Sequence, residues 1–88
     1  MTATAKQTAI FQEIVKEREF QDSKHGADGH SLGAWLLIVE SELEEAKHAA
    51  VKQGAGRDNI ISEIIQVAAV CFAALEQHGV KPLDGRRV

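Results

Sequence analysis

Three glutamates have the residue type and the spacing to form a chemical site together. Glu42 and Glu45 are three positions apart, and Glu63 lies in the next helix-forming segment. Residues three apart on a helix face the same side, and a facing helix can add another carboxylate. Clustered inward carboxylates are costly unless a cation lies among them. Because Mg²⁺ prefers oxygen ligands and typically bridges to phosphates, the spacing indicates a magnesium site.

The position of these acids on their helices separates them from ordinary surface glutamates. On a helical wheel of about 100° per residue, Glu42 falls within the apolar side of its helix and Glu45 at the edge of that side. Glu63 falls on the apolar side of the following helix. Glu40 and Glu44 fall on the opposite side, where we expect a solvated helix face.

A structural explanation of the inward acids also stays open. They can form ion pairs with Arg18, Lys24 or Arg57, or reach solvent at a helix edge, without holding a metal. A zinc site is excluded, since the chain has one cysteine and its histidines lack zinc-site spacing. The choice therefore lies between ion pairs and a hard divalent cation.

The hydrophobic periodicity that positions these acids is helical, and no alternating strand pattern is present. We therefore predict one all-α domain over residues 1–88. The predicted helices and tail are about 3–23, 32–53, 59–78 and 80–88.

Capping residues set the expected helix ends. Ser31 and Asp58 are the predicted N-caps of the second and third helices. Gly54 and Gly79 are the predicted glycines that close the same two helices.

The third helix is apolar around most of its circumference. Its main predicted stripe consists of Ile60, Ile64, Val67, Cys71 and Leu75. Two partner helices from one short chain cannot easily cover such a surface, and large exposed apolar patches are rare on monomers. We expect a three-helix protomer that forms a helical bundle by oligomerisation, as a homodimer or homotetramer.

Composition excludes several classes of partner. The net charge is −3 and the basic residues are scattered, so a nucleic-acid-binding face is not expected. The N-terminus has no signal-peptide pattern, and the apolar stretches are shorter than a membrane span requires. We expect a soluble, cytoplasmic protein without a membrane partner.

The ordered motifs resemble a known family. Glu42-Leu-Glu-Glu45 followed by Glu63-Ile-Ile-Gln66 resembles the Glu-x-x-Glu and Glu-x-x-Asp hallmark of MazG-like all-α nucleoside triphosphate pyrophosphohydrolases. Residues 17–26 are similar to the Glu-Arg-x-x-Gln-Asp-x-Lys-x-Gly opening of bacterial and phage-type members. His30 with Trp35, and residues 63–70, also resemble segments of that family, so the likeness covers roughly residues 14–77.

The resemblance implies a reaction, a cofactor and a set of site residues. The reaction is hydrolysis of a (deoxy)nucleoside triphosphate to the monophosphate and pyrophosphate, for housecleaning of the nucleotide pool. Glu42, Glu45 and Glu63 would be catalytic and would bind Mg²⁺, or alternatively Mn²⁺. Gln66 stands where the hallmark has aspartate, so the fourth ligand is a neutral carbonyl oxygen and the site has one charge fewer. The expected substrate-binding residues are Arg18, Gln21, Lys24, His30, Trp35 and Arg57.

Other functions stay open beside the pyrophosphohydrolase. One is a non-catalytic relative, a helical oligomer that binds a nucleotide or a protein partner without turnover. Another is a structural bundle in which the acids form ion pairs. Within the enzymes, a phosphoribosyl-ATP pyrophosphatase is the second choice.

Overall fold

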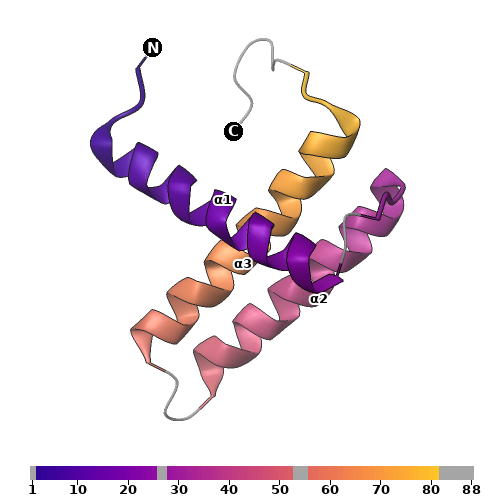
Figure 1. Cartoon of the computed structure of the whole chain (residues 1–88). Coiled ribbons are helices and arrows are strands. Elements are labelled where there is room, and N and C mark those ends of the chain that lie inside the picture. The colour runs from indigo at the N-terminus through magenta and orange to yellow at the C-terminus, as the bar shows by residue number, and fades with distance from the viewer. Residues whose placement is uncertain (1, 26–27, 53–55, 82–88) are drawn as a thin grey trace.

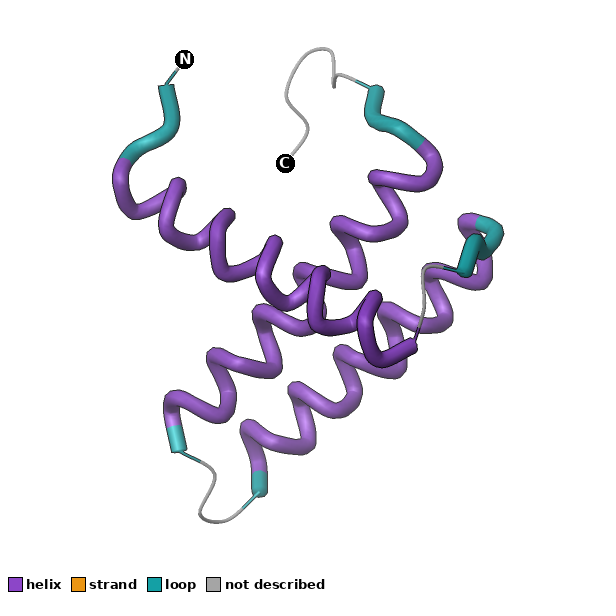
Figure 2. Tube along the Cα trace, in the orientation of Figure 1, coloured by secondary structure: helices purple, strands orange, loops and turns teal. Residues whose placement is uncertain are grey.

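The computed structural model describes residues 2–25, 28–52 and 56–81, which contain three helices and no strand. These helices are α1 (Ala5–His25), α2 (Leu32–Val51) and α3 (Arg57–His78). Figure 1 shows α2 and α3 side by side and antiparallel, with α1 crossing α3. Helix α3 packs against both other helices, and the tube in Figure 2 shows that the described part of the chain is helix with short loops at the helix ends. The all-α prediction is confirmed.

Local hydrogen bonds explain where α1 and α2 begin. The Ser31 hydroxyl accepts from the backbone N–H of Ala34 at 3.1 Å, which confirms the predicted cap. At the start of α1, the Thr4 hydroxyl accepts from the Gln7 N–H at 3.0 Å, and the Gln7 side-chain oxygen accepts from the Thr4 N–H at 2.8 Å. This reciprocal capping box places the start of α1 at Ala5, two residues after the predicted start.

The third helix begins and ends differently from the second. Its N-cap is Gly56, so the prediction of Asp58 as the cap was wrong. Asp58 lies in the first turn instead, where its negative charge interacts favourably with the positive N-terminal end of the helix dipole. Gly79 closes the helix as predicted: its φ is 82°, and its N–H donates to the Leu75 carbonyl at 2.8 Å. Gly54 and the tail from residue 82 lie outside the described residues.

The core is small and lies between α2 and α3. Trp35, Val70 and Ala73 form its buried cluster, against which Ile38, Val39 and Ala74 pack. The fully buried residues of α3 in the protomer are therefore Ala69, Val70 and Ala73, which do not belong to the predicted apolar stripe. Two of the α3 residues in this core, Ala73 and Ala74, are small, and small side chains permit a close approach of two helices. The bulkier Ile64 and Leu75 are 57% and 52% exposed.

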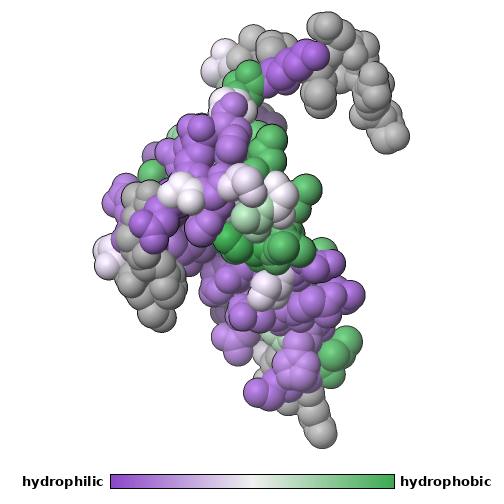
Figure 3. Space-filling model, turned by 90° about the vertical axis from the view of Figure 1, so that its right-hand side faces the viewer, coloured by the Kyte–Doolittle hydropathy of each residue, from purple (hydrophilic) through white to green (hydrophobic). Residues whose placement is uncertain are grey.

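Apolar surface is abundant on the outside of the molecule. Leu36 and Leu37 on α2 are 69% and 68% exposed, and Ile10 and Phe11 on α1 are half-exposed. Figure 3 shows one face with a central apolar patch surrounded by hydrophilic surface. Much of the hydrophobic surface of the helices is therefore exposed in the protomer.

Helix α3 is, by length and composition, apolar enough to cross a membrane. This result differs from the expectation that the apolar stretches are too short. It is weak evidence for a membrane span, because core helices of soluble proteins satisfy the same two criteria. Only 17% of the apolar window of α3 is fully buried in the protomer, and many of its other residues are partly covered by α1 and α2.

Candidate metal centre and adjoining pocket

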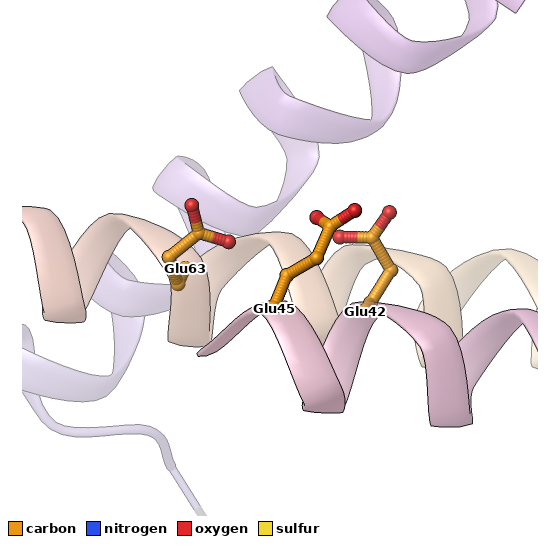
Figure 4. Close-up of side chains that lie close together, drawn as sticks. All are labelled: Glu42, Glu45 and Glu63. Carbon is orange, nitrogen blue, oxygen red and sulfur yellow. The ribbon is translucent and has the colours of Figure 1, made fainter. Parts of the chain in front are cut away.

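Three carboxylates converge where α2 and α3 lie side by side. Glu42 and Glu45 extend from successive turns of α2, and Glu63 extends from α3 on the same side of the pair (Figure 4). One carboxylate oxygen from each residue lies within 4.8 Å of the others. The helical spacing brings Glu42 and Glu45 together, and the antiparallel packing of α3 adds Glu63.

Burial makes this cluster unfavourable without a counter-charge. Glu42 and Glu63 are half-buried, whereas Glu45 is exposed at the helix edge. Oε2 of Glu63 is buried and has no hydrogen-bond partner among the described residues. Burial raises the pKa of Glu42, and the charges of Glu45, Glu63 and Glu17 raise it further. A divalent cation bound among these oxygens would offset both the cost of burying the carboxylates and their mutual repulsion.

Arg18, a predicted ion-pair partner of the inward acids, pairs with other carboxylates instead. The guanidinium of Arg18 binds Glu76 at 3.1 Å and Asp22 at 3.0 Å. In the described part of the chain, the other ion pairs are Lys16–Glu13 and Lys47–Glu44. None of these pairs includes the three converging carboxylates. The ion-pair explanation of the inward acids therefore finds no support from Arg18.

A pocket of about 640 Å³ adjoins the carboxylates. It is lined by the C-terminal half of α1, by the segment before α2, and by α2 and α3. Its lining residues are Glu17, Arg18, Phe20, Gln21, Asp22, Asp28, His30, Trp35, Ile38, Glu42, Glu45, Gln66, Val70 and Gln77. The volume falls in the range of about 300–1,000 Å³ that is usual for small-molecule sites.

The carboxylates border the pocket at one of its ends. Glu42 and Glu45 belong to its lining, together with Gln66. Glu63 does not; it borders a second hollow between α2 and α3, which Glu45 also lines. The three oxygens therefore mark the junction between the pocket and this hollow.

The structure brings together most of the expected substrate-binding residues. The pocket lining includes Arg18, Gln21, His30 and Trp35. Arg57 is exposed at the first residue of α3 and is absent from that lining. Lys24 belongs to the last turn of α1, but its side chain lies outside the described part of the structure.

An aromatic pair forms the opposite end of the pocket. The rings of His30 and Trp35 meet edge to face, with centroids 4.9 Å apart and an interplanar angle of 88°. Trp35 is only 8% exposed, and its indole N–H donates to the Gln77 side-chain oxygen at 2.8 Å. Trp35 is thus a core residue that also contributes to the pocket wall.

Seven residues of the pocket lining were not predicted as site residues, and Glu17 and Gln77 are two of them. Glu17 lines the pocket near Glu42 and accepts a hydrogen bond from Gln21 at 3.2 Å. Its spacing of four from Gln21 would have placed it on the same face of α1. Gln77 had no comparable signal, because its partner Trp35 is 42 residues away along the chain.

The arrangement defines a small helical protein with a candidate divalent-cation centre beside a ligand-sized pocket. No protein-family model, curated protein or solved structure matches the chain. Membership of the MazG-like family consequently stays a prediction from the motifs.

Proposed function

We propose that the chain hydrolyses a nucleoside or deoxynucleoside triphosphate to the monophosphate and pyrophosphate in a Mg²⁺-dependent reaction. The observation that carries the proposal is the convergence of Glu42, Glu45 and Glu63 within 4.8 Å, with one buried oxygen unpartnered among the described residues. Hard carboxylate oxygens in such a group suit Mg²⁺ or Mn²⁺. The MazG-like resemblance supplies the reaction class.

The three glutamates would hold the ion, with the amide oxygen of Gln66 as a neutral addition. A bound Mg²⁺ supplies charge neutralisation to the polyphosphate. Carboxylate oxygens of the same three residues would accept the proton of the water that attacks the α-phosphorus. Because Gln66 lacks the charge of an aspartate, the protein binds the ion more weakly than a four-carboxylate site would.

The rest of the pocket would hold the nucleoside. Gln21 lines it from α1, and His30 and Trp35 line it from the other end. Aromatic edges together with amide groups suit a flat heteroaromatic base. Arg18 is already bound to two carboxylates, so we propose that it shapes the pocket wall as well as meeting phosphate oxygens.

A non-catalytic nucleotide-binding protein is the second candidate. The observation that favours it is Gln66, because one neutral ligand reduces the negative charge available to a metal. Such a protein would keep the pocket and bind nucleotide without turnover.

One assay separates the two candidates. The full-length chain is incubated with each common ribo- and deoxyribonucleoside triphosphate, with and without Mg²⁺, and phosphate is measured with and without added inorganic pyrophosphatase. The enzyme should yield phosphate only when both Mg²⁺ and pyrophosphatase are present. A binding protein should yield none, while nucleotide raises its melting temperature. Absence of both effects would refute both candidates.

Matched variants assign any activity to the three glutamates. Glu42→Gln and Glu63→Gln should each lower turnover by at least about a hundredfold, the usual scale for losing a charge-stabilising group. Glu44→Gln is the control, since Glu44 is exposed on the same helix and pairs with Lys47. Equal turnover in all three variants would contradict the assignment.

We also propose that a second copy of the chain covers the exposed apolar surface. Helix α3 has only three fully buried residues in the protomer, and Leu36 and Leu37 on α2 are more than two-thirds exposed. Burial of such side chains contributes roughly 1.5–3 kcal/mol each, which favours self-association. This assembly would form a bundle of at least four helices, in keeping with a soluble, cytoplasmic enzyme.

The oligomer proposal has a direct test. Light scattering after size-exclusion chromatography, without detergent, should give at least twice the 9.6 kDa protomer mass. Leu36→Glu should shift the protein toward the monomer, whereas Glu44→Gln should not. A monodisperse monomer would contradict the proposal, and recovery only in detergent would favour a membrane partner for α3.

A further inference from the structure

The side chain of Gln77 connects the C-terminal end of α3 to the segment that precedes and begins α2. Its Oε1 accepts from the Trp35 indole N–H at 2.8 Å and from the His30 backbone N–H at 3.1 Å. Its Nε2 donates to the Asp28 carbonyl at 3.0 Å. One side chain thus satisfies three polar groups that lie 42 to 49 residues away along the chain.

These partners determine the orientation of the amide. Exchanging the Gln77 oxygen and nitrogen would place the NH₂ group against two N–H donors, from Trp35 and His30. The same exchange would place the oxygen against the Asp28 carbonyl. All three contacts would become repulsive, so the hydrogen-bond network permits one orientation. The side chain is therefore a fixed support rather than an adaptable surface group.

The groups that Gln77 holds form one wall of the pocket. Asp28, His30 and Trp35 all line the pocket, as does Gln77. The neighbouring His78 adds a second connection through its Nε2, which lies 2.7 Å from the His30 carbonyl oxygen. The T-shaped contact of the His30 and Trp35 rings depends on both residues being held in place.

We propose that Gln77 is a positioning residue that holds the Asp28–Trp35 wall in the shape that accepts the nucleoside part of the ligand. This inference rests on the proposed function for the identity of the ligand. Gln77 is eleven positions from Gln66, or about 16 Å along the helix at 1.5 Å per residue. Gln77 therefore acts on ligand recognition, at a distance from the carboxylates.

The single tryptophan permits a direct test in the full-length protein, because the chain has no tyrosine and Trp35 dominates its fluorescence. Gln77→Met keeps the side-chain length and removes all three hydrogen bonds. We expect red-shifted Trp35 emission and stronger acrylamide quenching in the ligand-free protein. With the preferred nucleotide, KM should rise about tenfold, equivalent to about 1.4 kcal/mol, while kcat changes by less than about twofold.

Two further variants make the test decisive. Gln12→Met is the matched control, since Gln12 is exposed on α1 and its side chain makes no hydrogen bond to the described residues. Gln77→Glu keeps an oxygen for Trp35 and His30 but loses the donor to Asp28, so its quenching should lie between that of the wild type and that of Gln77→Met. Circular dichroism checks that each variant is folded, and Gln77→Glu decides the question if Gln77→Met is unfolded.

The outcomes separate this inference from the proposed function. Trp35 fluorescence in Gln77→Met equal to that in Gln12→Met would overturn the role of Gln77. Quenching in Gln77→Glu as strong as in an unfolded chain would also overturn it, because the oxygen would then not hold the ring. If the wild type turns over no nucleotide, the proposed function fails, and the fluorescence series still decides whether Gln77 holds the wall.

Discussion

The Nε of Arg18 donates to Oε1 of Glu76 at 3.1 Å and so connects α1 to α3 across 58 residues of sequence. The same guanidinium binds Asp22 one turn further along α1. The Arg18 side chain is only 14% exposed, so this contact is part of the packing of α1 on α3. Arg18 thus pairs with Glu76 and Asp22, and no ion pair joins it to Glu42, Glu45 or Glu63.

We expect Arg18→Met to lower the free energy of unfolding by about 1 kcal/mol, since it removes the charge-assisted hydrogen bonds from a mostly buried guanidinium to Glu76 and Asp22. Urea denaturation followed by circular dichroism measures this change. Lys16→Met is the control, because the Lys16–Glu13 pair is exposed and should contribute less than roughly 0.5 kcal/mol. Equal losses in the two variants would show that the Arg18 contacts do not hold α1 in place.

The stability of the metal-free protein should depend on pH through Glu42. The pKa of Glu42 in the folded protein lies above its ordinary value of 4.5, first because of burial and then because of neighbouring carboxylates. The folded state therefore binds this proton more tightly than the unfolded chain does. The stabilisation is complete below about pH 4.5 and is lost as the pH rises through the folded-state pKa. In EDTA, the Glu42 contribution should raise the melting temperature as the pH falls from 7 toward 5.

Two controls assign this pH dependence. Glu42→Gln should flatten the curve relative to the wild type, whereas Glu44→Gln on the solvent side should leave it unchanged. Saturating Mg²⁺ should reverse the trend, because protons then compete with the ion for the carboxylates. A curve that Glu42→Gln does not alter would exclude Glu42 as its source.

Restoring a carboxylate at position 66 should strengthen metal binding. Gln66 is half-buried and lines the pocket with Glu42 and Glu45. We expect Gln66→Asp to lower the Mg²⁺ concentration that half-saturates thermal stabilisation by about tenfold, because affinity increases with the charge of the ligands. In EDTA the same variant should melt at a lower temperature, since another negative charge joins the cluster. Gln12→Asp, at an exposed position, should produce neither effect.

Removal of the α2 cap should cost a measurable part of the stability. Ser31→Ala leaves the Ala34 N–H without the hydroxyl that accepts its hydrogen bond. We expect the free energy of unfolding to fall by about 1 kcal/mol, measured by urea denaturation. Ser31→Asp, another favourable N-cap, should retain most of the stability. A loss in Ser31→Asp as large as that in Ser31→Ala would contradict the capping explanation.

The helices themselves were largely predictable from local patterns. The N-cap at Ser31, the closing glycine at position 79 and the shared side of Glu42 and Glu45 all follow from short-range spacing. The Thr4–Gln7 capping box was also present in the sequence and would have placed the start of α1 correctly. Asp58 was the misleading residue, because an acid in the first turn of a helix resembles an N-cap in sequence.

What the sequence determined by itself was therefore the helices and the face on which each side chain lies, because both depend on residues within about one turn. The tertiary structure decided which helix faces meet. It brings Glu63 close to Glu42 and Glu45. It also pairs Arg18 with Glu76 and places the Gln77 side chain in hydrogen-bond contact with Trp35. These contacts depend on how far each helix is shifted and rotated against its neighbour. Packing of the small core between α2 and α3 sets that register, and no local spacing encodes it.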